Sequence, residues 1–152
     1  MKVINFSETR SIINQYMMEL RDENIQKDML RFRHNITRMG ELMAYEVSKT
    51  LEYQKTTTKT CLGEAATETL SEPLVLSTIL RAGLPLHQGM NNVFDHAENA
   101  FVSAYRKYID EEKFIIHIEY IACPRIDGKT LVICDPMLAT GSSMELAYEA
   151  LC

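Results

Sequence analysis

A segment near the carboxyl end of the chain carries the side chains that could do chemistry. Residues 131–143, LVICDPMLATGSS, place the carboxylate of Asp135 directly after an apolar run, and hydroxyl groups and a glycine then open a helical pattern at positions 140–143. The free N–H groups and the dipole of a helix start attract phosphate oxygens, and glycine lets the backbone approach a ligand closely. This segment therefore predicts a phosphate-binding loop.

A simpler interpretation of the same loop is a turn that caps a helix. Residues 140–143 taken alone favour this turn, but residues 131–143 taken as a whole favour a phosphate-binding loop. The segment has neither the GxxxxGK[ST] spacing of a Walker loop nor the GxGxxG spacing of a dinucleotide-binding fold. It therefore indicates phosphate binding without indicating ATP or NAD.

Four segments carry a resemblance to a known family. VICDPMLATGSS resembles the phosphoribosyl-diphosphate loop of type I phosphoribosyltransferases, and Pro136 after the acidic residue is typical of the uracil phosphoribosyltransferase family within them. STILRAGLPLHQGM, AYRK and ELMAYEVSKTLEY are similar to three further segments of that family. The resemblance extends from about Arg21 to the end of the chain. It implies transfer of a phosphoribosyl group from 5-phosphoribosyl 1-diphosphate to uracil, giving UMP and diphosphate.

The resemblance also assigns roles to residues. Asp135 and Arg106 are expected to be catalytic, because Asp135 would stabilise positive charge on the ribose and Arg106 negative charge on the departing diphosphate. No protein nucleophile is needed, and Mg²⁺ is expected to bind through the diphosphate with no direct protein ligand. The expected donor-binding residues are Arg81, Arg106, Asp135, Pro136, Met137, Leu138, Ala139, Thr140, Gly141, Ser142 and Ser143.

Alternatives remain open. Arg81 could pair with an acid, and Arg106 lies beside a charge-rich turn that is typical of solvated surface. The histidines lack metal-binding spacing and are predicted to be surface or structural residues. Two other functions are compatible with the loop: a pyrimidine-responsive regulator that binds RNA, and a phosphoribosyltransferase for another base.

The chain departs from the family pattern at three points. Ser142 replaces a glycine, which would be strained by about 1 kcal/mol if that position requires a positive φ. Lys107 replaces an acidic residue. The Gly-Asp-Ala-Gly-Asp motif, with which the family recognises uracil, does not occur before Cys152. We therefore expect a chain truncated at its C-terminus, with little activity of its own and an unpaired sheet edge.

Periodicity predicts the elements that must position these residues. Apolar residues at helical spacing predict helices over 12–20 and 29–47, and another helix that includes residues 86–94. Apolar runs predict strands at 74–80, 100–105, 114–124 and 131–134, with the last in the middle of the sheet. The fold class is α/β, with an open, mostly parallel sheet of the type I phosphoribosyltransferase kind, an N-terminal helical segment and a β-hairpin arm. One domain is expected over 1–152, comprising N-terminal helices (1–53), a polar arm (54–72) and the α/β core (73–152).

Composition limits the partners. The net charge is −5 with scattered basic residues, so no nucleic-acid partner is expected. No apolar run reaches the roughly 20 residues that span a bilayer, so no membrane partner is expected. The four cysteines form no CxxC pair and are interpreted as reduced thiols of a cytoplasmic protein. The full-length protein is expected to form a homo-oligomer.

Overall fold

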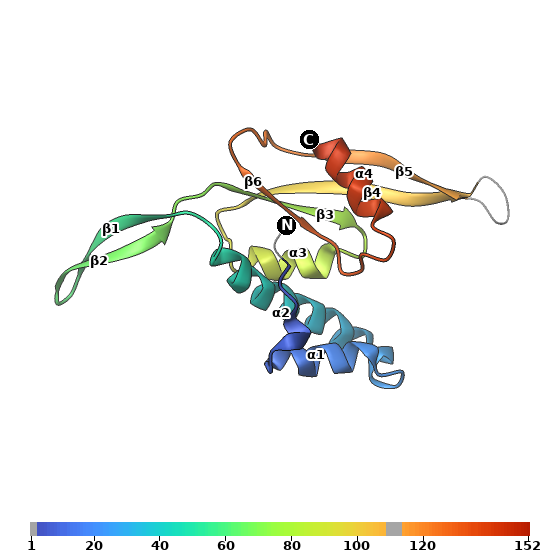
Figure 1. Ribbon diagram of the computed structural model, residues 1–152, viewed down its shortest axis with the longest axis horizontal. Helices are drawn as coiled ribbons and strands as arrows, with labels where there is room; N and C mark the ends of the chain where they lie inside the picture. Colours follow the sequence, from blue (N-terminus) through green and yellow to red (C-terminus); the bar gives the residue numbers. More distant parts are fainter. Residues whose placement is uncertain (1–2, 109–113) are drawn as a thin grey trace.

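The computed structural model describes residues 3–108 and 114–152, and it describes no side chain from residue 105 to residue 117. Helices alternate with strands through most of the chain (Figure 1). The elements are η1 (Phe6–Glu8), α1 (Ile12–Arg21), η2 (Ile25–Lys27), α2 (Met29–Ser48), β1 (Tyr53–Thr60), β2 (Gly63–Leu70), β3 (Leu74–Leu80), α3 (Leu84–Asn91), β4 (Glu98–Tyr108), β5 (Phe114–Ala122), β6 (Thr130–Cys134) and α4 (Ser142–Leu151).

The central sheet has the order β5-β4-β3-β6. Strand β3 pairs in parallel with both β4 and β6, whereas β5 is antiparallel to β4. Helices α2 and α3 lie on one side of this sheet with α1 packed on α2, and α4 lies on the other side (Figure 1). The predicted α/β class with a mostly parallel sheet is therefore confirmed.

Two apolar clusters fill the faces of the sheet because successive side chains of a strand point to opposite faces. Leu74 and Leu76 of β3 pack with residues of α2 and α3. Val75 and Ile79 pack instead with Ala147 and other residues on the α4 side. Every residue of β3 from Leu74 to Ile79 is buried, as expected for a strand that is covered on both faces.

The prediction that residues 131–134 lie in the middle of the sheet is wrong. Strand β6 forms one edge of the four-stranded sheet, and only Cys134 in it is buried. The interior position next to it belongs to β3, whose continuous apolar run is the longer one. Hydrophobicity shows that a strand is covered on its faces, but it does not show how many neighbours the strand has.

Helix α3 is also shorter than the apolar pattern suggested. It ends at Asn91, and the buried Phe94 follows in a turn in which its N–H group bonds the carbonyl oxygen of Met90 at 2.9 Å. The turn brings Phe94 to the core without a continued helix. Its apolar side chain therefore fits the helical spacing although the residue lies outside the helix.

Helices α2 and α3 cross closely at two glycines. A methyl group on Gly89 would collide with the carbonyl oxygen of Thr37 and lie 2.9 Å from the Cα atom of Gly40. A methyl group on Gly40 would likewise collide with the carbonyl oxygen of Leu86. The absence of side chains at both positions allows the two helices to approach and fixes α3 against the sheet. Among the residues that the structure describes, no helix has the length and apolar character to cross a membrane.

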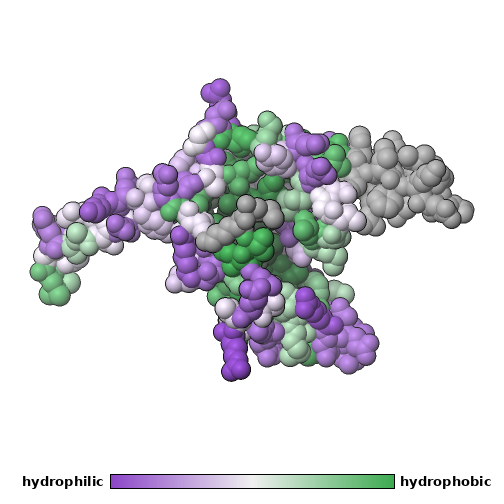
Figure 2. Space-filling view, in the orientation of Figure 1, coloured by the Kyte–Doolittle hydropathy of each residue, from purple (hydrophilic) through white to green (hydrophobic). Residues whose placement is uncertain are grey.

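Strands β1 and β2 form an antiparallel hairpin that projects from the body of the molecule (Figure 1). Its side chains are almost all exposed, and its surface is mainly polar apart from an apolar tip (Figure 2), where Leu62 is 96% exposed. Glu72 anchors the base of the hairpin: its carboxylate accepts hydrogen bonds from the backbone N–H of Glu52 at 2.8 Å and from the hydroxyl of Thr130. The predicted arm is therefore confirmed.

Candidate phosphate-binding site

The ends of three parallel strands define the candidate site. Strands β3, β4 and β6 run in the same direction, so their carboxyl ends lie at one edge of the sheet, where ligands of open α/β sheets bind. The turn with Arg81 follows β3 and the loop that starts at Asp135 follows β6. Thr78 of β3 pairs in register with Cys134 of β6, which brings these two segments side by side.

The turn after β3 connects that strand to α3. The peptide bond between Leu80 and Arg81 is cis, and Arg81 is exposed. Gly83 is buried: a methyl group on it would collide with the Thr78 hydroxyl and lie 2.8 Å from the carbonyl oxygen of Cys134. Glycine at position 83 therefore lets the Arg81 turn rest on the ends of β3 and β6.

The loop after β6 reverses direction with two residues of positive φ, Ala139 at 48° and Gly141 at 85°. Ser142 is the first residue of α4 and does not have a positive φ. The strain considered for a serine at this position is therefore absent. The glycine that the backbone requires in this loop is Gly141, one residue earlier.

The first turn of α4 lies beside this loop, where the Ser142 N–H makes a long hydrogen bond of 3.5 Å to the hydroxyl of Thr140. Gly141 is the N-cap and supplies no side-chain hydrogen bond, so the helix starts without a capping carboxylate. The hydroxyl groups of Thr140 and Ser142 lie 3.0 Å apart and form a pair beside the helix start. Backbone N–H groups, hydroxyl donors and the helix dipole together can bind a phosphate group.

Asp135 lies at the start of this loop, half-buried next to Cys134. Its Oδ1 atom accepts a long hydrogen bond of 3.4 Å from the backbone N–H of Met137, and no other hydrogen bond to this carboxylate comes from the side chains that the structure describes, which exclude residues 105–117. Burial raises the pKa of the neighbouring Cys134 thiol to about 12, so this cysteine stays protonated. Its sulfur is therefore no nucleophile, which is consistent with a reaction that needs none.

Other loop residues differ in exposure. Pro136, Met137, Leu138, Ala139 and Thr140 are exposed, whereas Gly141 to Ser143 are half-buried where the helix meets the sheet. Met137 and Leu138 are 75% and 64% exposed. An apolar side chain this exposed in a short loop is available to cover a bound ligand.

Arg106 lies in β4, where its backbone pairs with Ile116 of β5. It follows Ser103, the residue of β4 paired with the end of β3, so its backbone lies beyond the carboxyl end of β3. The side chain of Arg106 lies outside the described part of the chain. The structure thus brings the Arg81 and Asp135 segments together and places the Arg106 backbone at the same edge.

The side chains at this edge fit a Mg²⁺ ion that binds together with a phosphate ligand. No group of three or more His, Cys, Asp or Glu side chains that could hold a metal ion occurs within residues 3–104 and 118–152. Mg²⁺ usually keeps several waters and binds substrate phosphates together with one or two carboxylates. Asp135 is the carboxylate available at the loop, so the residues fit an ion that arrives with a diphosphate and do not form a cage of their own.

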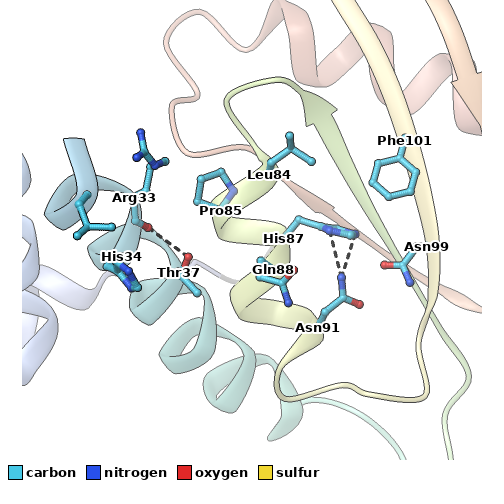
Figure 3. A pocket seen from close by; sticks show the side chains of 11 residues that line it. Arg33, His34, Thr37, Leu84, Pro85, His87, Gln88, Asn91, Asn99 and Phe101 are labelled. Carbon is cyan, nitrogen blue, oxygen red and sulfur yellow. Dashed lines mark hydrogen bonds between the residues drawn. The ribbon is translucent and has the colours of Figure 1, made fainter.

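A separate cavity of about 660 Å³ lies between α2, α3 and β4 (Figure 3). It contains none of the predicted site residues, although Leu84 and Pro85 in its wall directly follow the Arg81 turn. His87 forms its inner wall: it is 5% exposed, and its Nε2 atom lies 3.3 Å from the carbonyl oxygen of Leu76. Burial lowers the pKa of His87, and its contact with Leu76 joins α3 to the sheet, while the prediction that the histidines are surface or structural residues stays a prediction.

Sequence reasoning missed Thr78, which is completely buried and whose hydroxyl donates a 3.2 Å hydrogen bond to the carbonyl oxygen of Cys134. A polar residue inside the apolar run LVLSTIL was the available signal.

The mostly parallel sheet, with a glycine-containing loop and a helix start at its carboxyl edge, is an open α/β fold consistent with the phosphoribosyltransferase class. The family model for uracil phosphoribosyltransferase matches residues 7–152. A protein of Porphyromonas gingivalis named uracil phosphoribosyltransferase is 60% identical over 151 residues, which are 99% of this chain and 70% of that protein. The chain belongs to the uracil phosphoribosyltransferase family.

A more distant relative and a solved structure are also similar to this chain. A uracil phosphoribosyltransferase of Methanothermobacter thermautotrophicus is 39% identical over 142 residues, which are 92% of this chain and 64% of the relative. Among solved structures, the AQ2163 protein from Aquifex aeolicus superimposes with a TM-score of 0.79 at 29% identity, covering 94% of this chain and 67% of that one. The chain thus spans about two thirds of the length of these proteins.

Proposed function

We propose that this protein transfers the phosphoribosyl group of 5-phosphoribosyl 1-diphosphate to uracil, forming UMP and diphosphate in pyrimidine salvage. One observation carries the proposal. The loop from Asp135 to Ser143 joins the end of a parallel strand to an uncapped helix start, in a chain 60% identical to a uracil phosphoribosyltransferase. A loop of this kind suits the 5-phosphate and hydroxyl groups of a ribose.

The roles of the residues follow from the charges that the reaction creates. A ring nitrogen of uracil forms a bond to C1 of the ribose and releases its proton to solvent, and the bond from C1 to diphosphate breaks with its electron pair leaving on the diphosphate. Asp135 would stabilise the positive charge that develops on the ribose. Arg81 and Arg106 would stabilise the negative charge of the leaving group. The remaining donor-binding residues would hold the ribose 5-phosphate: Pro136, Met137, Leu138, Ala139, Thr140, Gly141, Ser142 and Ser143.

Magnesium belongs to this proposal as a partner of the donor. Mg²⁺ bound to the diphosphate neutralises charge on the leaving group. Since the described residues fit an ion that the donor brings, we expect chelation of Mg²⁺ to abolish UMP formation, while the melting temperature of the ligand-free protein stays the same. A fall in that melting temperature on chelation would indicate a structural metal and contradict this role.

The decisive experiment incubates the protein, in its complete natural form, with labelled uracil, 5-phosphoribosyl 1-diphosphate and Mg²⁺. Labelled UMP and one equivalent of diphosphate are expected. Parallel reactions with other bases should give no nucleotide. Formation of a nucleotide from another base, with none from uracil, would overturn the assignment of the substrate.

The proposal also covers the ligands, the cellular location and the oligomeric state of the protein. The expected ligands are the donor and uracil, with no nucleic acid, as the net charge of −5 supports. All four cysteines are free thiols, which supports a location in the cytoplasm. Exposed apolar side chains on the N-terminal helices, such as Met29 and Leu30 at 63% each, support a homo-oligomer.

A further inference from the structure

Thr78 lies where the two candidate ligand segments meet. It is the last residue of β3 that pairs with β6, and its partner in register is Cys134. Its side chain is fully buried, and its hydroxyl donates a 3.2 Å hydrogen bond to the carbonyl oxygen of Cys134. Asp135 follows Cys134, so this hydrogen bond fixes the peptide group that leads into the first residue of the loop.

The same hydroxyl also supports the Arg81 turn. A methyl group on Gly83 would collide with the Thr78 hydroxyl, which means that the backbone of the turn lies directly on it. The carbonyl oxygens of Cys134 and Ile79 are at 2.8 Å from that same methyl position. One buried side chain therefore touches the end of β6 and the turn after β3 at once.

We infer that Thr78 is a positioning residue that sets the distance between the Arg81 turn and the Asp135 loop, so that both can hold one donor molecule. This inference rests on the proposed function, in which the two segments bind opposite ends of 5-phosphoribosyl 1-diphosphate. Because Thr78 is fully buried, this role needs no contact between its side chain and the substrate. Its effect is geometric, because a shift of about 1 Å in positioning can reduce a rate by about 100-fold.

The neighbouring strand residue provides a matched control. Ser77 is equally buried in β3, but its hydroxyl has no hydrogen-bond partner among the residues that the structure describes. It points to the opposite face of the sheet, away from the Thr78–Cys134 hydrogen bond. Removal of the Ser77 hydroxyl therefore tests the loss of a buried oxygen from this strand without loss of the link between the loops.

The experiment measures kcat and the KM values for donor and uracil in the complete protein. Thr78→Val keeps the shape and removes the hydrogen bond, and it is expected to raise the donor KM or lower kcat so that kcat/KM for the donor falls about tenfold. The uracil KM should change by less than about twofold. Thr78→Ser, which keeps the hydroxyl, and Ser77→Ala should both remain within about twofold of the unmodified protein.

A second pair protects the test against misfolding of the valine variant. Thr78→Ala and Thr78→Ser both lack the methyl group and differ only in the oxygen, so the donor kcat/KM of the alanine variant should be the lower by about fivefold to tenfold. Equal values for this pair would overturn the inference. A loss in Ser77→Ala as large as that in Thr78→Val would overturn it as well.

Calorimetric titration of the protein with 5-phosphoribosyl 1-diphosphate, in the presence of Mg²⁺, separates this inference from the proposed function. If the unmodified protein binds the donor but forms no UMP, the proposed substrate is wrong, and the donor Kd values of the same variants decide the role of Thr78. If the unmodified protein does not bind the donor, both the proposed function and the role of Thr78 are wrong.

Discussion

Asp135 combines two properties that a charge-stabilising residue needs. It starts the loop after β6, and among the described side chains, those outside residues 105–117, its carboxylate has one hydrogen bond, a long one of 3.4 Å accepted from the backbone N–H of Met137. A carboxylate with few protein partners keeps its charge available to the ligand. Its contribution should be greatest at the transition state, where positive charge on the ribose is greatest.

We therefore predict that Asp135→Asn lowers kcat by about 100-fold or more, while the donor Kd changes by less than about fivefold. Steady-state kinetics and calorimetric titration with the donor measure the two quantities. The asparagine keeps the size of the side chain, so the melting temperature serves as a control for folding. Equal losses in kcat and in donor affinity would assign Asp135 to ground-state binding instead.

Gly83 is restricted by space. Alanine there would place a methyl group 2.8 Å from the carbonyl oxygens of Cys134 and Ile79, so the Arg81 turn would have to move. We predict that Gly83→Ala weakens donor binding by about tenfold and destabilises the protein by about 1–3 kcal/mol. Donor titration and urea unfolding measure both effects.

Gly63 in the hairpin is the control for this substitution. It has a φ of 133° and no atom within 4 Å of an added methyl group. Gly63→Ala should therefore lower the free energy of unfolding through backbone strain but leave the donor affinity unchanged. A similar loss of donor affinity in both variants would show that the effect on binding is not local to the turn.

At the scale of elements, the crossing of α2 and α3 positions the helix that follows the Arg81 turn. Alanine is a better helix former than glycine by about 1 kcal/mol, so Gly89→Ala would stabilise an isolated helix. In this fold the added methyl group would lie 2.9 Å from the Cα atom of Gly40. We predict a net destabilisation of about 1–3 kcal/mol, measured by urea unfolding.

The exposed Gln88 offers a control in the same helix. Gln88→Ala introduces a methyl group in the same helix without a clash, and because glutamine is already a good helix former, it should change the free energy of unfolding by less than about 0.5 kcal/mol. If Gly89→Ala were as stable as Gln88→Ala, close helix contact would not be the reason for the glycine.

At the scale of the whole molecule, His87 connects α3 to the sheet, and its buried neutral ring should make the free energy of unfolding depend on pH. Its Nε2–H donates to the carbonyl oxygen of Leu76. Its Nδ1 accepts from the Asn91 side chain at 3.1 Å (Figure 3), so both nitrogens of the neutral ring are bonded. Burial lowers the pKa of His87 below its usual 6.5. Between these two pKa values the unfolded chain binds more protons than the folded one.

Stability should therefore fall as the pH drops below about 6.5 toward the lowered pKa of His87, and the loss should level off below that pKa. His87→Gln should remove this slope in urea-unfolding experiments between pH 7 and pH 5. His96→Gln, at a side chain that is 99% exposed, should retain it. Hydrogen bonds lower the pKa values of Glu72 and Glu19, so their contributions disappear only in more acidic solution, below about pH 4.5, and do not affect this comparison.

The sequence alone predicted much of this protein because local patterns carry the information. The apolar run of β3 was predicted at its observed bounds, Leu74–Leu80, and the apolar stripe of α2 was predicted within one residue. The loop after β6 and the helix start that follows it were predicted from neighbouring residues, and phosphate binding by this loop stays a prediction. The roles of its residues stay predictions, together with the division into residues 1–53, 54–72 and 73–152.

The tertiary structure decided what depends on contacts between distant segments. The edge position of β6 and the burial of His87 follow from which strands and helices pack together, and no local pattern contains that information. The hydrogen bond from Thr78 to Cys134 joins residues 56 positions apart. Sequence thus predicted a candidate phosphate loop, because its groups are adjacent in the chain, whereas only packing decided what holds this loop beside the Arg81 turn.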